Sequence, residues 1–236
     1  PPPVALAAAM AVHLTLIDKL SDDPLRDFPP VNPAAITPDL LVVNPSMPAR
    51  TVREFIALAK AKPGSINYAS GGSGTPSHLA AELFKTMSGV QMNHVPYKGS
   101  IPALTDIVGG QVSLMFDSMA SALPFVKSGK LRALAQTGAR RSSAAPEIPT
   151  IAESGLPGYD VAGWFGVFAP AGTPRDIVLR LSNEITQILN LPDVRERYAL
   201  LGAEPGPGNP DEFGRFLAAE ISKWAKVIRD SGTKAE

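Results

Sequence analysis

The chain of 236 residues contains no cysteine, which excludes disulfide bonds, thiolate nucleophiles and cysteine-ligated metal sites. It also has no excess of charge of either sign, because 22 basic residues balance 22 acidic ones. No basic run marks a surface for nucleic acid or anionic lipid. The three histidines, His13, His78 and His94, lack metal-ligand spacing. We therefore expect no metal or other cofactor and no nucleic-acid partner.

Long hydrophobic runs are also missing. A transmembrane helix takes about 20 apolar residues, whereas the longest early run is Val4–Val12. No basic segment precedes this run, so the chain shows no pattern of a secretory signal peptide. A buried strand at Val4–Ala9 is the preferred interpretation, although its alanines also favour a helix.

The most informative segment is a strand, a glycine loop and a helix in succession, within Asn67–Leu79. Residues 65–69 are typical of a strand, and Thr75-Pro76 supplies an N-cap and a proline at the first helical position. We expect the helix at 76–88 to present free backbone N–H groups beyond a loop bare of side chains. Such a helix end binds a carboxylate or a phosphate. The alternative is that the glycines only make a tight turn.

The same segment does not match three better-known motifs. A dinucleotide-binding fingerprint needs a glycine where Ser77 stands. A P-loop needs Gly-Lys-Ser/Thr, but the pair Gly129-Lys130 precedes a leucine. A nucleophile elbow on Ser73 needs a glycine at the position of Thr75. The pattern therefore predicts anion capture without naming a ligand.

Strand and helix patterns alternate along the chain. Strands are predicted at 40–43, 65–69, 90–95, 112–116, 131–136 and 161–168. Helices are predicted at 52–62, 76–88, 101–108, 119–128, 174–189, 193–202 and 210–229. The alternation predicts a largely parallel sheet with helices on both faces. Because ligands bind at the carboxyl ends of such strands, the loop after Ala69 and the pair Asp117-Ser118 after Phe116 are singled out.

Eight motifs carry a family resemblance. In order they are Tyr68–Ala80, His94–Gly99, Gly110–Val112, Met115–Asp117, Gly129–Ala135, Pro149–Gly155, Trp164–Gly166 and Ala169–Pro174. Together they resemble the tripartite tricarboxylate transporter substrate-binding proteins, also called the Bordetella uptake gene family. The resemblance extends from about Val4 to the C-terminus.

This resemblance implies an α/β protein of the periplasmic binding protein type II class, with two α/β lobes joined by a hinge. Lobe 1 would comprise residues 1–46 and 162–236, and lobe 2 residues 47–161. Family members are non-enzymatic periplasmic proteins that close on a small di- or tricarboxylate, aromatic acid or acidic amino acid. They pass this ligand to membrane transporter subunits. Backbone N–H groups, hydroxyls and ordered water hold the carboxylates.

The chain departs from the family pattern at its N-terminal end. Family members begin with two further strand–helix units, so the resemblance starts at the third strand and lobe 1 is expected to be reduced. Ala11 and His13 take the place of a Ser/Thr-rich loop near the ligand. Whether the chain is a fragment or has a reduced lobe, we expect weakened or absent binding unless a second chain completes the sheet. We also expect self-association through exposed sheet edge and apolar surface.

The candidate ligand-binding residues lie on four short segments. They are Ala11, His13, Ser70, Gly71, Gly72, Ser73, Gly74, Thr75, Ser77, Tyr97, Asp117 and Ser118. Ser70, Gly74 and Thr75 are the preferred contacts, although Thr75 is also expected to cap the helix. Asp117 has three alternative roles: binding an amine, orienting a water, or capping the helix from Met119.

Two other functions stay open from the sequence. One is a hydrolase that uses Ser73 or Ser118 with a histidine, although no serine lies in a recognised nucleophile setting. The other is a relative that binds no ligand and acts as an assembly or sensor module. Ligand-dependent thermal stabilisation separates a binding protein from the second of these.

Overall fold

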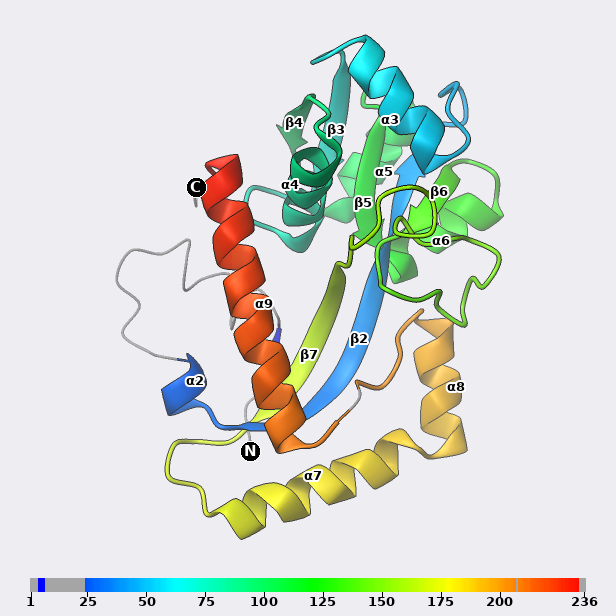
Figure 1. Cartoon of the computed structure of the whole chain (residues 1–236). Coiled ribbons are helices and arrows are strands. Elements are labelled where there is room, and N and C mark those ends of the chain that lie inside the picture. Colours follow the sequence, from blue (N-terminus) through cyan, green and yellow to red (C-terminus); the bar gives the residue numbers. More distant parts are fainter. Residues whose placement is uncertain (1–3, 7–23, 207, 234–236) are drawn as a thin grey trace. The chain divides into compact units, whose positions relative to one another are not determined.

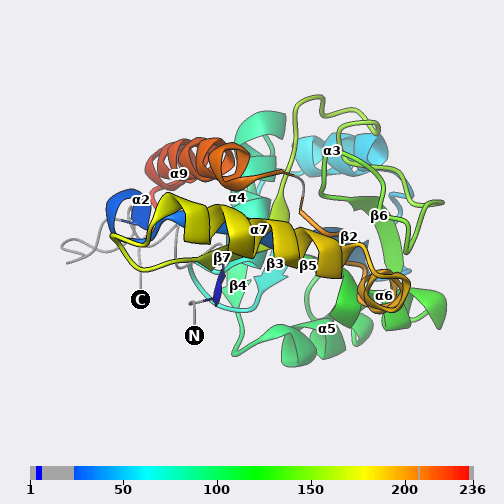
Figure 2. The same cartoon turned by 90° about the horizontal axis from the view of Figure 1, so that it is seen from below.

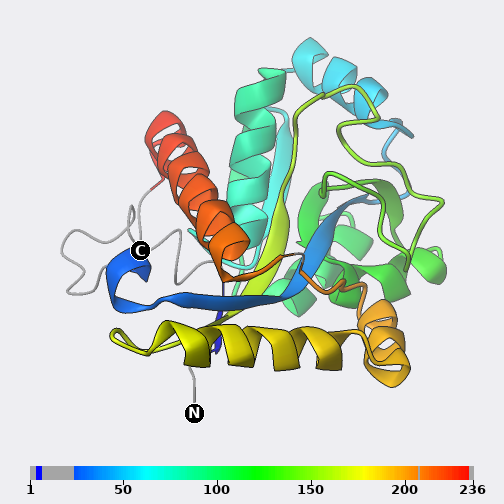
Figure 3. The ribbon, with the colours of Figure 1, turned by 60° about the horizontal axis from the view of Figure 1, so that its bottom comes forward.

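The computed structural model describes residues 4–6, 24–206 and 208–233, and the contacts divide the chain into two compact units. Unit 1 comprises residues 1–37 and 163–235, and unit 2 comprises residues 38–162. The boundaries predicted from the sequence were 46/47 and 161/162. The chain enters unit 2 within the long strand β2 (Pro30–Val43), which Figure 3 shows as one continuous ribbon.

The sheet of unit 2 has the strand order β6–β2–β5–β3–β4. Besides β2, its strands are β3 (Ile66–Ser70), β4 (Met92–Pro96), β5 (Leu114–Ser118) and β6 (Arg132–Gln136). β3 is parallel to β4 and β5, whereas β2 is antiparallel to β5 and β6. The prediction of a largely parallel sheet is therefore wrong for β2. This strand enters from unit 1 and does not follow a crossover helix, so the rule for βαβ connections does not set its direction.

Helices cover both faces of this sheet (Figure 1). α5 (Ser100–Val108) and α6 (Met119–Lys127) pack against a buried cluster that includes Leu40 and Met115. α4 (Pro76–Ser88) follows β3 and α3 (Val52–Ala61) follows β2, and between them Phe84 packs against the rings of Phe55, Phe116 and Tyr159. Consecutive strand residues point to opposite faces of a sheet. Met115 therefore packs on the side of α5 and α6, and Phe116 packs on the side of α4.

Local signals set the ends of two helices as predicted. α4 begins at Pro76 and ends before Gly89, whose φ of 70° is a left-handed conformation that glycine adopts without strain. α9 (Pro210–Ser231) begins with a capping box between Asn209 and Glu212. The helix predicted at 101–108 begins one residue earlier, since Ser100 is the first residue of α5 and Gly99 precedes it.

In unit 1, β1 (Val4–Leu6) pairs antiparallel with β7 (Ala162–Phe168). The remainder of the strand predicted at 4–9 lies outside the described residues. α9 contacts both α2 (Pro24–Asp27) and α7 (Arg175–Leu189), and α8 (Pro192–Leu200) follows α7 (Figure 2). Trp164, Phe168 and Phe213 are fully buried here. Gly166 makes this packing possible, because a Cβ there would lie 2.2 Å from Phe213 Cζ.

β2 is longer than the strand predicted at 40–43. It begins at Pro30 and includes Pro33 and Pro38, residues that usually interrupt a ladder because they have no N–H to donate. The backbone of Ile36 nevertheless exchanges two hydrogen bonds with Glu204, of 2.7 and 2.8 Å.

Within the described ranges, none of the helices combines the length and the apolar character that a membrane span requires.

Candidate functional site

Three loops meet at the edge of unit 2 where β3, β4 and β5 end. These strands are parallel neighbours, so their carboxyl ends share one edge. The backbone N–H of Tyr97 donates to the Ser70 carbonyl over 3.0 Å, and a second bond of 3.2 Å joins the same two loops. Ser100 donates from Oγ to Asp117 Oδ1 over 2.6 Å. The loops that follow β3 and β5 are therefore linked through the loop after β4.

The glycine loop at residues 71–75 is held by its own hydrogen bonds. Four of its backbone amides have acceptors: Ser77 Oγ for Gly71 (3.0 Å), Ser70 Oγ for Gly72 (3.1 Å), His78 Nδ1 for Gly74 (3.0 Å) and the Gly72 carbonyl for Thr75 (3.3 Å). The amides of Gly74 and Thr75, two preferred contacts, are thus already paired. The loop is a rigid rim whose amides a ligand would have to take from these acceptors.

Thr75 does not cap α4 through its side chain. Its hydroxyl donates instead to the Gly72 carbonyl over 2.6 Å and lies 3.0 Å from Ser77 Oγ. The hydroxyl therefore closes the turn of the glycine loop and leaves the first helical amides to other acceptors. Pro76 has no N–H, and the Ser77 N–H has no acceptor among the described residues. This amide lies at the positive end of the helix dipole, where an anion is stabilised.

Two stacked histidines support the loop from beneath. The rings of His78 and His94 are 3.9 Å apart and nearly parallel, and Tyr68 stacks on His94 at 5.0 Å. Because the Gly74 N–H donates to His78 Nδ1, this nitrogen carries no proton. The His78 proton then resides on Nε2, which lies 3.7 Å from Glu82 Oε1.

Glu82 is a buried acid with a structural role. It accepts hydrogen bonds from the Tyr68 hydroxyl over 2.5 Å and from Lys85 Nζ over 2.7 Å. Burial and the bond to Glu82 hold the pKa of the Tyr68 hydroxyl well above its usual range. Both donors come from within unit 2, so the carboxylate ties α4 to β3 beneath the histidines.

A serine–histidine pair is present, but its serine is buried. Ser70 Oγ lies 2.6 Å from His94 Nε2, the spacing of a nucleophile and its base. Ser70 is fully buried, and its hydroxyl also bonds to Gly72. Ser118 acts as the N-cap of α6 by accepting from the Ser121 N–H. Among the described residues, these two serines therefore serve structure.

Asp117 is held by two hydroxyls. Ser100 donates to its Oδ1 and Ser121 to its Oδ2, each over 2.6 Å. Burial raises the pKa of the Asp117 carboxyl, and the two hydroxyl bonds partly oppose this rise. On the neighbouring strand, burial and then the charge of Asp117 raise the pKa of Asp39 to about 7. The edge thus carries two buried acids, one of which titrates near neutrality.

Asp39 is absent from the residues predicted from the sequence. The strand predicted from the sequence covers only residues 40–43, so Asp39, which follows Pro38, falls just outside it. In the structure Asp39 lies opposite Ser118 in the β2–β5 ladder. An acid directly before the run Leu40–Val43 is the one signal that would have pointed to it.

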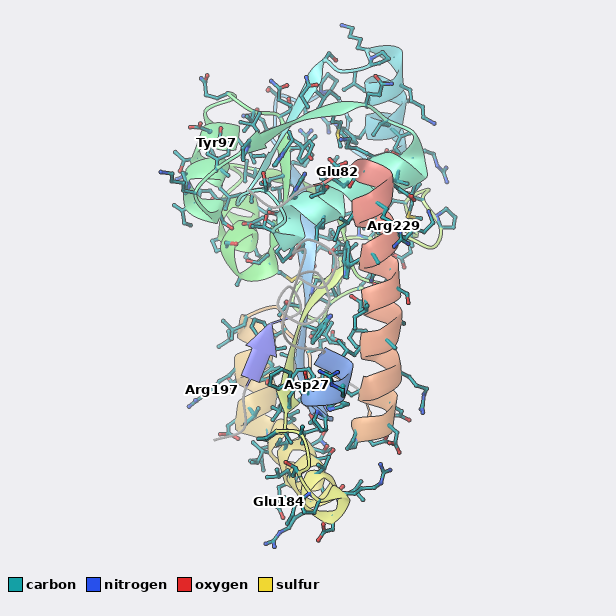
Figure 4. The ribbon with its side chains drawn as sticks, turned by 90° about the vertical axis from the view of Figure 1, so that its left-hand side faces the viewer. Asp27, Glu82, Tyr97, Glu184, Arg197 and Arg229 are labelled. Atoms are coloured by element: carbon teal, nitrogen blue, oxygen red, sulfur yellow. The ribbon has the colours of Figure 1, made fainter. Side chains whose placement is uncertain are left out.

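Tyr97, another residue predicted from the sequence, lies on the α5 side of the sheet (Figure 4). The Tyr97 hydroxyl donates to Asp106 Oδ2 over 2.8 Å, and burial together with this bond raises its pKa to about 12. Only its backbone therefore joins the rim. Ala11 and His13 lie outside the described residues.

Comparison with known proteins places this geometry in a family. The model of the "Tripartite tricarboxylate transporter family receptor" matches residues 4–233. Protein BugT of Bordetella pertussis is 38% identical over 228 residues, which are 97% of this chain and 70% of that protein. A UPF0065 protein of a Pseudomonas strain is 42% identical over 204 residues, which are 86% of this chain and 61% of that relative.

Solved structures agree with the sequence relatives. The Rhodopseudomonas palustris protein Rpa4515, solved with adipate, superposes with a TM-score of 0.83 at 38% identity. The superposition covers 98% of this chain and 77% of the Rpa4515 chain. MatC of the same organism, solved with bound malate, superposes with a TM-score of 0.77 at 32% identity. The superposition covers 95% of this chain and 78% of MatC. The resemblance inferred from the eight motifs and the type II binding-protein fold are therefore confirmed.

Proposed function

This chain belongs to the tripartite tricarboxylate transporter receptor family, and we propose that it captures a small carboxylate at the carboxyl edge of β3, β4 and β5. The observation that carries the proposal is the meeting of three loops there, linked by backbone and hydroxyl bonds. At their centre the Ser77 amide has no acceptor among the described residues and lies at the N-terminus of α4. An amide at the positive end of a helix dipole favours a carboxylate.

The proposed ligand is a di- or tricarboxylate, an aromatic acid or an acidic amino acid. Relatives solved with adipate and with malate support this class. The contacts would come from the Ser77 amide and, where the ligand replaces their present acceptors, from the amides of Gly74 and Thr75. Ser70 is fully buried and would contribute through its hydrogen bonds to Gly72 in this rim. Ala11 and His13 belong to the same proposal as contacts from the other lobe.

In this proposal the protein works in the periplasm and passes its ligand to membrane transporter subunits. Family membership supports both statements. Residues 1–46 with 162–236 and residues 47–161 would form the two lobes. The chain spans between 61% and 70% of the length of the first relatives compared, and weaker binding than that of a full-length relative is expected for it.

Calorimetric titration of the chain with adipate and with malate tests the proposal. The wild-type chain should bind at least one of the two. Thr75→Asp should weaken that binding at least tenfold, because a carboxylate at the start of α4 competes with the ligand for the same amides and dipole. Aspartate is a favourable N-cap, so the helix should persist.

Thr75→Val is the matched control. It removes the same hydroxyl bond to Gly72 without adding charge, and it should keep its affinity within a fewfold of the wild type. Equal affinity of the aspartate and valine variants would place the ligand elsewhere. No binding by the wild-type chain would favour a relative without ligand that serves assembly or sensing.

A further inference from the structure

Asp39 is an acid fixed at the same edge of unit 2. It lies opposite Ser118 in the ladder between β2 and β5 and is 7% exposed. Thr137 holds its backbone from the other side: Thr137 Oγ1 accepts from the Asp39 N–H over 2.8 Å, and the Thr137 N–H donates to the Asp39 carbonyl over 2.9 Å. These backbone bonds fix the main chain of Asp39 at this edge.

No residue in the described part of the chain donates a hydrogen bond to the Asp39 carboxyl or forms an ion pair with it. Asp117, the nearby acid, has two hydroxyl donors. Asp39 is therefore a largely buried acid without a protein donor among the described residues, and its carboxyl oxygens keep some exposure to solvent. A buried acid without donors costs free energy unless it is neutral or a ligand supplies its partner.

The titratable groups near Asp39 do not favour its charged form. The Asp117 carboxyl of β5 acts on Asp39 through its charge, although the register places the two side chains on opposite faces of the sheet. Asp39 also interacts electrostatically with Tyr159, whose hydroxyl donates to the Ala80 carbonyl over 2.9 Å. Among the described residues no lysine or arginine contributes to its titration. Burial and the charge of Asp117 together raise the Asp39 pKa to about 7. Asp39 therefore holds a proton over part of the neutral range.

We propose that protonated Asp39 donates a hydrogen bond to a carboxylate of the bound ligand, so that the ligand is taken up together with one proton. This inference rests on the proposed function. It adds Asp39 as a ligand contact and couples ligand binding to the uptake of a proton. A neutral carboxylic acid and a carboxylate form a strong, charge-assisted hydrogen bond. An ionised Asp39 would instead repel the same ligand. The proton comes from solvent and stays on the Asp39 carboxyl, and no covalent bond other than this O–H changes.

The opposite role for Asp39 is recognition of a cation. An ionised Asp39 beside Asp117 would bind an ammonium group, and affinity would then rise with pH. The proton-coupled role makes affinity for a dicarboxylate fall with pH. The sign of the pH dependence therefore separates the two roles.

The test is calorimetric titration of the full chain with adipate from about pH 6 to about pH 9, in pairs of buffers that differ in ionisation enthalpy. Both adipate carboxyls are ionised over most of this range, because ordinary carboxyl pKa values lie near 4. The dissociation constant should rise up to tenfold per pH unit above about pH 7. At the alkaline end the buffer dependence of the heat should report close to one proton taken up per adipate.

Asp39→Asn is the matched variant, because its side-chain amide is a permanent donor of nearly the same shape. Its affinity for adipate should not depend on pH, and the heat should not depend on the buffer. Asp117→Asn should keep the pH dependence and move its midpoint to lower pH, since the charge that raises the Asp39 pKa is removed. The proton count on the wild-type chain needs no variant and stands if a variant fails to fold.

Four outcomes would overturn the inference. Binding of adipate with a flat pH profile and no proton uptake would leave the proposed function intact and remove the role of Asp39. An unchanged pH profile in Asp39→Asn, or affinity that rises with pH, would do the same. No binding of adipate or malate at any pH would overturn the proposed function itself, and the inference with it.

Discussion

The His78 ring should position the glycine loop through one atom, and two substitutions isolate that atom. His78 Nδ1 accepts the Gly74 N–H over 3.0 Å, and the ring also stacks on His94 at 3.9 Å. In His78→Asn the amide oxygen occupies the place of Nδ1 and keeps the acceptor. In His78→Gln the amide lies one atom further out and loses it, while both variants lose the stack.

The magnitudes follow from these two contacts. Loss of the stack should destabilise both variants by about 0.5–1.5 kcal/mol. Loss of the acceptor should add about 1 kcal/mol in His78→Gln alone, a further fall in Tm of about 2–4 °C for a chain of this size. Glutamine is the better helix former, so an advantage of the asparagine variant cannot come from helix propensity.

Thermal unfolding and hydrogen exchange of the Gly74 amide make the comparison. The asparagine variant should melt higher than the glutamine variant and keep the Gly74 amide protected. A glutamine variant that is equally stable, with Gly74 equally protected, would refute the positioning role of His78 Nδ1.

Three further predictions concern stability. The pKa of Asp39 is raised from 3.8 to about 7 in the folded chain. The free energy of unfolding of the wild-type chain should therefore fall by up to about 4 kcal/mol relative to that of Asp39→Asn as pH rises from about 4 to about 8. If urea unfolding shows the same difference between the two chains at every pH, the burial of this acid is contradicted. Gly166→Ala should destabilise unit 1 by at least about 1–3 kcal/mol, because its Cβ would lie 2.2 Å from a buried phenylalanine ring. The control, Gly214→Ala within α9, should be neutral or stabilising. Equal melting temperatures of the two variants would show that the ring moves aside. Tyr68→Phe should cost about 1–2 kcal/mol in urea unfolding, since a buried glutamate loses one of its two donors; no change would mean that water replaces the hydroxyl.

Local signals predicted much of the fold. Pro76 at the first helical position and the glycine at position 89 bracket α4 as the structure has it, because the conformations of proline and glycine are decided locally, whereas the cap expected from the Thr75 side chain does not form. α9 likewise begins at Pro210, as predicted. The direction and length of β2 could not be predicted in this way. They depend on pairing with β5, β6 and β7, which lie far away in the sequence.

The candidate site shows the same division. Its place at the ends of β3 and β5 follows from alternating elements and from the rule for parallel strands. The pairing of the loop amides could not be predicted in this way. The acceptors of the Gly71 and Gly74 amides are side chains of α4, and packing determines the direction in which these side chains point. Asp39 was missed for a related reason: only the register between β2 and β5 brings it to the edge.

The crystal structure of this chain grown with adipate is the most direct measurement of the central claim. We expect one carboxylate of the ligand within hydrogen-bond distance of the Ser77 amide at the start of α4, with the other rim residues around it. Adipate bound away from the edge formed by β3, β4 and β5, or an edge that stays empty at saturating adipate, would contradict it.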